Sequence, residues 1–226
     1  MIDPALPAIA TEPGEQTLAG LWSFTLQALV ARAAHEVNNA LNGAIVNVEV
    51  VKARARPGAD GGTAAPFAEA ASAQLEELAA LTEALLALGR PPRGTPDAAL
   101  IARHASAHLT PGLQRLHVRI ELSGARSCPV DGDPTAVRLA VVAGLLAAVD
   151  AAARMAETAG TDSADEPTRR VGCTTVFDDR PTVEIAPRYG ATVPPAVARA
   201  LAAVDVVVSA DSEMLRIALP KRSEPY

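Results

Sequence analysis

The chain has 226 residues, a formal net charge of −6 and no dense block of lysine and arginine. Binding to a nucleic-acid backbone needs a clustered basic surface, so we expect no nucleic-acid partner. Hydrophobic residues make up 49% of the chain and aromatic residues only 3%. Alanine and leucine dominate, and both are strong helix formers. The composition therefore indicates a folded protein with an aliphatic and mostly helical core.

The cysteines and the N-terminus bear on the cellular compartment. Cys128 and Cys173 stand apart from each other and form no CxxC pair, which we interpret as two free thiols in a reducing compartment. We expect no apolar run that approaches the roughly 20 residues needed to span a bilayer. Residues 1–14 carry acids instead of the basic start and apolar stretch of a signal peptide. These features predict a cytoplasmic protein with no membrane partner.

The N-terminal third of the chain predicts two long helices after a flexible lead-in at residues 1–16. Residues 17–54 contain no proline, and their apolar residues recur in steps of three and four, which is typical of one continuous helix. A loop with Pro-Gly and Gly-Gly follows, and Pro66 then opens a second helix that extends to about residue 88. The apolar stripes are Leu18, Leu21, Trp22, Leu26, Leu29, Ala33, Val37, Leu41, Ala44, Val48 and Val51 in the first helix, and Phe67, Ala71, Leu75, Leu78, Leu81, Leu85 and Leu88 in the second.

Two long helices joined by a short loop predict an antiparallel helical hairpin, which we assign to residues 17–90. A single hairpin cannot bury a complete apolar stripe by itself. Two hairpins together make a four-helix bundle, so the pattern predicts a homodimer.

The composition changes after a linker at residues 89–96, and residues 91–226 are expected to form a second, α+β domain. Asp97 is expected to cap one helix, and Asp133-Pro134 is a typical start for another. The predicted elements are helices at 97–108, 133–159 and 195–203, and strands at 117–122, 170–177, 182–186, 204–209 and 214–219.

A candidate nucleophile lies in the first helix. His35 is expected to point roughly opposite the apolar stripe. Glu36 is its immediate neighbour, and Asn39 and Asn42 share its face of the helix. A neutral imidazole is nucleophilic at cytoplasmic pH, and a carboxylate beside it can take up the other ring proton. On composition alone, these residues fit an ordinary solvated helix face better than a site.

The amino-acid sequence of this segment resembles the H-box of sensor histidine kinases. From His35 it reads His-Glu-Val-Asn-Asn-Ala-Leu-Asn-Gly-Ala-Ile. The resemblance implies that His35 accepts a phosphoryl group and that Glu36 assists the transfer. It also implies that Asn39 helps to orient water when a phosphorylated receiver domain is hydrolysed. The usual proline of the motif is Ala40 here, so we expect a weaker kink in the helix.

The second half resembles the ATP-binding (Bergerat, HATPase-like) domain of the same kinases in the order and size of its elements. On that frame the two asparagines that handle magnesium and phosphate fall at Ala143 and Ala147, and the acid that recognises adenine falls at Arg188. Thr192 replaces a glycine, and the glycine-rich lid is absent. Alanine cannot ligate a metal and arginine carries no acceptor. The resemblance therefore implies a degenerate ATPase-like α/β sandwich that holds no ATP or other cofactor.

This combination resembles the dimeric histidine phosphotransferases of the ChpT and sporulation types, which carry phosphate between receiver-domain aspartates. It implies receiver domains as phosphoryl donor and acceptor, and catalytic roles for His35, Glu36 and Asn39. Two alternatives stay open: a receiver phosphatase or pseudokinase that uses Asn39 with Glu36, and a binding scaffold for which His35 is dispensable. His104 and His108 have the i,i+4 spacing of a zinc pair but no third ligand nearby, and we interpret them as an ordinary helix face.

Overall fold

The computed structural model describes residues 17–55, 64–90, 94–113, 116–159 and 168–221. The predicted lead-in at residues 1–16 lies outside these ranges. The helices are α1 (Leu18–Arg54), α2 (Ala65–Gly89), α3 (Ala98–Leu113), α4 (Pro134–Ala159) and α5 (Pro195–Ala202), and the strands are β1 (Val118–Gly124), β2 (Arg169–Val176), β3 (Thr182–Ala186), β4 (Val207–Ala210) and β5 (Leu215–Ala218). The predicted α+β fold class is confirmed, while the dimeric bundle stays a prediction.

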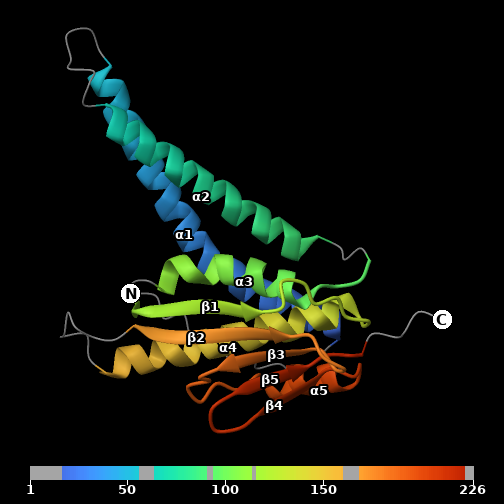
Figure 1. The fold of residues 1–226 in the computed structure, drawn as a ribbon. Helices are drawn as coiled ribbons and strands as arrows, with labels where there is room; N and C mark the ends of the chain where they lie inside the picture. Colours follow the sequence, from blue (N-terminus) through green and yellow to red (C-terminus); the bar gives the residue numbers. More distant parts are fainter. Residues whose placement is uncertain (1–16, 56–63, 91–93, 114–115, 160–167, 222–226) are drawn as a thin grey trace.

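Helices α1 and α2 form the predicted hairpin and lie side by side (Figure 1). The side chain of Thr17 caps α1 by accepting a hydrogen bond from the Gly20 amide at 3.2 Å, and Pro66 lies in the first turn of α2. Asn47 of α1 donates a hydrogen bond to Gln74 of α2 at 3.1 Å. Gly43 lies against the same glutamine, where a Cβ would collide with its amide. Gly43 therefore leaves room on α1 for the amide of Gln74.

The five strands form one mixed sheet in the order β1-β2-β3-β5-β4. Strands β1 and β2 pair in parallel, with α4 as the crossover between them, and the remaining pairs are antiparallel. Apolar and polar residues alternate along β2 and β3, which is the period expected for a sheet covered on one face. On the other face Ser123 is hydrogen-bonded to Thr174, and Arg216 forms an ion pair with Glu184.

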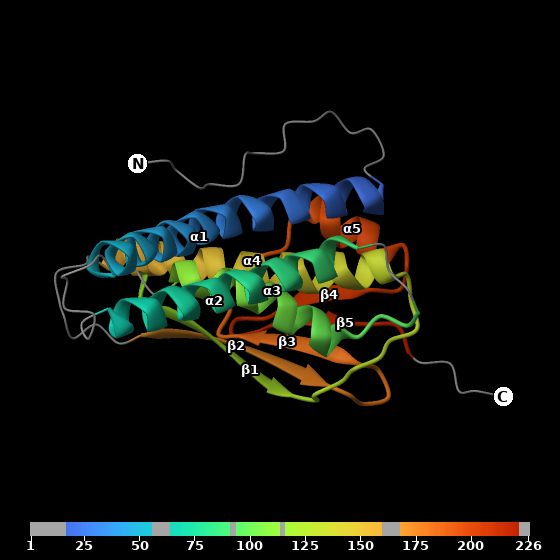
Figure 2. The ribbon, with the colours of Figure 1, turned by 90° about the horizontal axis from the view of Figure 1, so that it is seen from above.

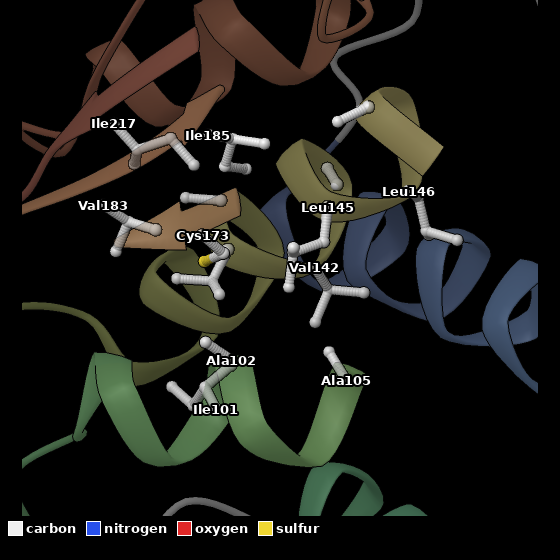
Figure 3. Packing of buried hydrophobic residues seen from close by; sticks show 14 of the residues in the cluster. Ile101, Ala102, Ala105, Val142, Leu145, Leu146, Cys173, Val183, Ile185 and Ile217 are labelled. Atoms are coloured by element: carbon white, nitrogen blue, oxygen red, sulfur yellow. The ribbon is translucent and has the colours of Figure 1, made fainter. Parts of the chain in front are cut away.

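Helix α4 forms the centre of the core. Figure 3 shows its residues Val142 and Leu145 packed between α3 and the apolar side chains of the sheet. Gly144 allows α4 to lie close to the sheet, because a Cβ there would be only 2.7 Å from the Ile217 Cδ1 atom of β5. The first turn of α4 is capped as predicted, since the Asp133 carboxylate accepts hydrogen bonds from the amides of Thr135 and Ala136 at 2.7 and 3.0 Å.

The hairpin and the α+β half share this core. Leu21 and Leu29 of α1 and Leu88 of α2 belong to the same buried cluster as the side chains of α4 and the sheet. Viewed from above, α1 runs along α4 (Figure 2). The domain boundary near residue 90 stays a prediction. The two halves of the chain nevertheless contribute side chains to one common core.

One expectation about the helices needs correction. The third helix continues to Leu113, five residues beyond the predicted end at about 108. Leu41 and Val48 of the predicted apolar stripe of α1 are 39% and 37% exposed in the single chain, which a single hairpin cannot cover completely. The α1 residues that belong to the shared core or pack against it lie between Leu18 and Leu29, whereas the far end of α1 runs beside α2, away from the sheet (Figure 1).

The expectation that no segment is long enough to cross a membrane also needs correction. Within the described residues, Pro134–Ala156 of α4 passes this test on length and hydropathy, with a mean hydropathy of 1.9. However, 78% of that segment is buried inside the protein. This degree of burial is what a central core helix shows, so the segment is weak evidence for a membrane span.

Gly124, at the end of β1, provides a test of the β1–β2 edge. Its φ of +86° lies in the left-handed region, and a Cβ would collide with the Thr175 carbonyl oxygen. We expect Gly124→Ala to lower the free energy of unfolding by at least about 1–3 kcal/mol, as measured by urea denaturation. Gly89→Ala is the matched control, because a Cβ at Gly89 meets nothing within 4 Å. Equal stability of the two variants would contradict the described geometry.

Candidate functional site

The predicted site residues His35, Glu36 and Asn39 all lie on α1, which continues as an α-helix through Ala40 without a break. The side chain of Glu36 is half-buried and that of Asn39 is exposed. The side chain of His35 lies outside the described part of the structure, so its predicted outward orientation stays a prediction. The backbone therefore places the three residues within little more than one helical turn.

Asn47 serves as the reference for the directions of side chains around α1, because its hydrogen bond to Gln74 shows that it faces α2. With 3.6 residues per turn, positions 35, 39, 42 and 46 are rotated about 80° to 140° from Asn47 in one direction. We call these four positions the histidine flank. Asn39, Asn42 and Val46 are exposed, and Val46 reaches 62%. Positions 39, 42 and 46 of this flank are therefore accessible in the single chain.

One turn before His35, Arg32 forms an ion pair with Asp150 of α4. The side chains of Arg32 and Asp150 are only 24% and 16% exposed. A second arginine, Arg138 of α4, donates hydrogen bonds to the carbonyls of Leu88 and Arg90 at the end of α2, at 3.2 and 2.6 Å. Helix α4 is thus attached to both helices of the hairpin through charged groups.

Sequence reasoning missed the Arg32–Asp150 pair. The available signal was Asp150 itself, the one charged residue between Arg138 and Arg154 in an otherwise apolar helix. A carboxylate withdrawn from water needs a partner, so Asp150 could have been recognised from the sequence as a contact site. Its partner could not be found, because 118 residues separate the two in the sequence.

The structure describes the four positions that the resemblance to kinases aligns with an ATP site, Ala143, Ala147, Arg188 and Thr192. Ala143 is 6% exposed in the shared core and Ala147 is half-buried against it. The Arg188 guanidinium donates to the Ala191 carbonyl at 3.1 Å, and its buried Nε atom has no hydrogen-bond partner in the described part of the chain. Thr192 is exposed.

A cavity of about 180 Å³ lies between α3, β1 and β2. Its lining includes Arg103, Leu122 and Cys173 but no residue of α1, α2 or α4. The cavity is smaller than the roughly 300–1,000 Å³ of typical small-molecule sites. It therefore contains neither the predicted catalytic residues nor the positions aligned with an ATP site.

His108 departs from the ordinary helix face that its spacing suggested. Its side chain is 2% exposed, and neither ring nitrogen has a hydrogen-bond partner in the described residues. Burial lowers the pKa of His108 and nearby His104 lowers it further, whereas the backbone of Ala84 on α2 opposes the shift. Among the described residues, no group of three or more His, Cys, Asp or Glu side chains is arranged to hold a metal.

The two cysteines are free, as predicted, and both are buried. Burial raises the pKa of Cys173 to about 12 and, with the nearby Asp97 charge, that of Cys128 to about 11. Both groups are therefore neutral thiols at physiological pH and poor nucleophiles.

No family model and no curated protein matches the chain. Among solved structures, the histidine kinase AdeS of Acinetobacter baumannii is 13% identical with a TM-score of 0.40, covering 84% of this chain and 98% of its own. A bacterial phosphotransferase is 13% identical with a TM-score of 0.41 and coverages of 92% and 98%. The histidine kinase domain of EL346 from Erythrobacter litoralis is 15% identical with a TM-score of 0.34 and coverages of 80% and 96%. At these TM-scores the similarities assign no activity to the chain.

The buried His108 should make stability depend on pH. A histidine whose pKa is lowered in the folded state favours folding when it is neutral, so this contribution is complete above the unfolded pKa of about 6.5 and is lost as the pH falls below it. We therefore expect the melting temperature to drop between pH 7.5 and 5.5, and to drop less in His108→Leu. His117→Asn, at an exposed histidine with φ of +49°, is the control. Identical pH profiles for His108→Leu and the parent protein would contradict this role.

Proposed function

We propose that the chain is a histidine phosphotransferase of two-component signalling, which relays a phosphoryl group between receiver-domain aspartates through His35. The observation that carries the proposal is the placement of the His-Glu-x-x-Asn segment. It lies on one uninterrupted helix of a long hairpin, on a flank where Asn39 and Asn42 are exposed. The hairpin in turn packs against an α+β half whose ATP-site positions carry alanine and arginine.

The proposed reaction needs no nucleotide. A phosphorylated aspartate of a receiver is an acyl phosphate. The neutral imidazole of His35 attacks its phosphorus, the P–N bond forms, and the P–O bond breaks as the aspartate carboxylate leaves. Glu36 takes up the proton from the other ring nitrogen of the cationic phosphoimidazole. The reverse sequence passes the group to a second receiver. The protein supplies mainly orientation, which is a large part of catalysis for a reaction between two separate molecules.

The alternatives differ in what they require of His35. Exposure of Asn39 also suits a receiver phosphatase, in which the amide orients the attacking water and the histidine carries no phosphate. A binding scaffold would need neither residue. We favour the relay because position 35 shares its flank with the exposed Asn39 and Asn42 and is followed directly by Glu36.

The proposed partners are receiver domains in the cytoplasm and a second copy of the chain. The second copy is supported by an exposed apolar surface on the hairpin. Since α1 and α2 are antiparallel, residues that follow Asn47 and Gln74 by one position turn to the same side of the hairpin. This apolar flank consists of Leu41, Ile45, Val48, Leu75 and Leu86, each between 37% and 51% exposed. On α1 its positions 41, 45 and 48 are rotated about 80° to 140° from position 35, across the line of contact with α2, so a partner helix pair would approach α1 from a different direction than a receiver.

Phosphoryl transfer is the direct test of the proposal. Radiolabelled phosphate should move from a phosphorylated receiver to this protein and be acid-labile and base-stable, as phosphohistidine is. His35→Ala should abolish labelling, and Glu36→Gln should slow it by a factor on the order of 10² if the carboxylate acts as a base. Radiolabelled ATP with magnesium, offered in place of the receiver, should give no label. Labelling of His35→Ala, or labelling from ATP, would refute the proposal.

The dimer can be tested at exposed positions, where a charge is harmless to the single chain. Leu78 and Leu85 of the predicted stripe are half-buried within the hairpin, so a charge there would also disturb its folding. Ile45→Glu with Leu75→Glu should instead give a folded monomer by light scattering, because an unpaired charge is costly to bury at an interface. Val46→Glu, on the histidine flank, should remain a dimer. A dimeric Ile45→Glu/Leu75→Glu variant would place the interface elsewhere.

A further inference from the structure

The ion pair between Arg32 and Asp150 lies within one helical turn of the proposed phosphoryl acceptor. Residues three apart on a helix are neighbours on its surface, so Arg32 belongs to the turn that leads into His35. Its partner comes from a different unit of the fold, the second half of α4. The pair is therefore a direct connection between the α+β half and the His35 turn.

The burial of the pair makes this connection specific. Both side chains are largely withdrawn from water, and removal of one partner from such a pair leaves the other charge uncompensated. Sliding or rotation of α1 against α4 would also separate the two charges. The buried residues that α1 contributes to the shared core, Leu21 and Leu29, are aliphatic and have no such directional requirement. The ion pair is thus the contact that can define the rotation of α1 at this level.

The other end of α4 holds the other helix of the hairpin. Arg138 binds the last carbonyls of α2, about 18 Å from Asp150 along the helix axis. These carbonyls lack partners within α2, and a cation at a helix C-terminus is favourable. One helix of the α+β half therefore fixes both helices of the hairpin at two separate levels.

We infer that Arg32 and Asp150 are a positioning pair, through which the α+β half sets the orientation of the His35 turn for phosphoryl transfer. This inference rests on the proposed function. In that function the α+β half binds no nucleotide, and the inference gives this half a role. Arg32 acts through the position of α1 and makes no contact with the phosphoryl group. Transfer to His35 depends on alignment with the P–O bond that breaks, and a misplacement of about 1 Å can cost on the order of 10²-fold in rate.

The test compares Asp150→Asn, Arg32→Gln and the double variant in label transfer from a phosphorylated receiver. We expect each single variant to lower kcat by about 10- to 100-fold with little change in KM for the receiver. The double variant should be no slower than the single variants, because the two residues act as one unit. The control is Glu49→Gln, which removes the exposed ion pair with Lys52 on the same helix. Additive losses in the double variant would show independent roles and overturn the inference, as would a parent-like rate for Asp150→Asn.

A second measurement is independent of phosphoryl transfer. Hydrogen exchange of the α1 amides around residues 31–36 should be faster in Asp150→Asn than in the parent protein, and unchanged in Glu49→Gln. Unchanged exchange in Asp150→Asn would overturn the positioning role even if the parent protein transfers phosphate. If the parent protein takes up no label but exchange is still faster in Asp150→Asn, the result would support the contact between the α+β half and α1. The same result would refute the proposed function.

Discussion

Packing of the first half of α1 against α4 is the contact on which the rest of the structure depends. Leu21 and Leu29 are almost fully buried in the cluster that also contains the sheet-facing side of α4. Helix α1 has 37 residues and rises about 1.5 Å per residue, so it extends far beyond this contact. An uninterrupted helix transmits orientation along its length. Anchoring of its first half therefore also directs the His35 turn and, through Asn47 and Gln74, the path of α2.

The alanines of α4 connect this packing to the proposed loss of nucleotide binding. A polar side chain at position 143 would need a hydrogen-bond partner in a site that is 6% exposed, and burial without one is costly. Alanine at that position instead joins the aliphatic core and lets neighbouring helices approach. The same alanine that carries no ligand for magnesium in the proposed alignment thus also favours packing between α4 and its neighbours. In the proposed function, the attachment of the hairpin and the lack of ATP binding would both depend on the small side chains of α4.

Local patterns in the sequence predicted most of the fold. Periodicity and caps placed every helix and strand, because Thr17, Pro66 and Asp133 act on the backbone next to them. The parallel pairing of β1 with β2 and the strand order depend on contacts between distant segments, which no local pattern encodes. For the same reason the periodicity of α1 could not tell that Leu29 is buried and Leu41 exposed. The candidate site followed from one motif on one helix, whereas the Asp150 partner and the burial of His108 required the assembled structure.

The two flanks of α1 explain how a fixed hairpin remains compatible with the proposed relay. The histidine flank and the apolar flank are rotated in opposite directions from the line of contact with α2, so a dimer partner and a receiver would approach from different sides. A receiver brings its own phosphoryl group to the histidine, and no part of this chain has to move a nucleotide toward it. A rigid connection through Arg32 and Asp150 then restricts nothing that the reaction needs. The connection lowers the entropic cost of aligning the histidine with the phosphoryl group. A protein that binds no nucleotide can contribute to the transfer in this way.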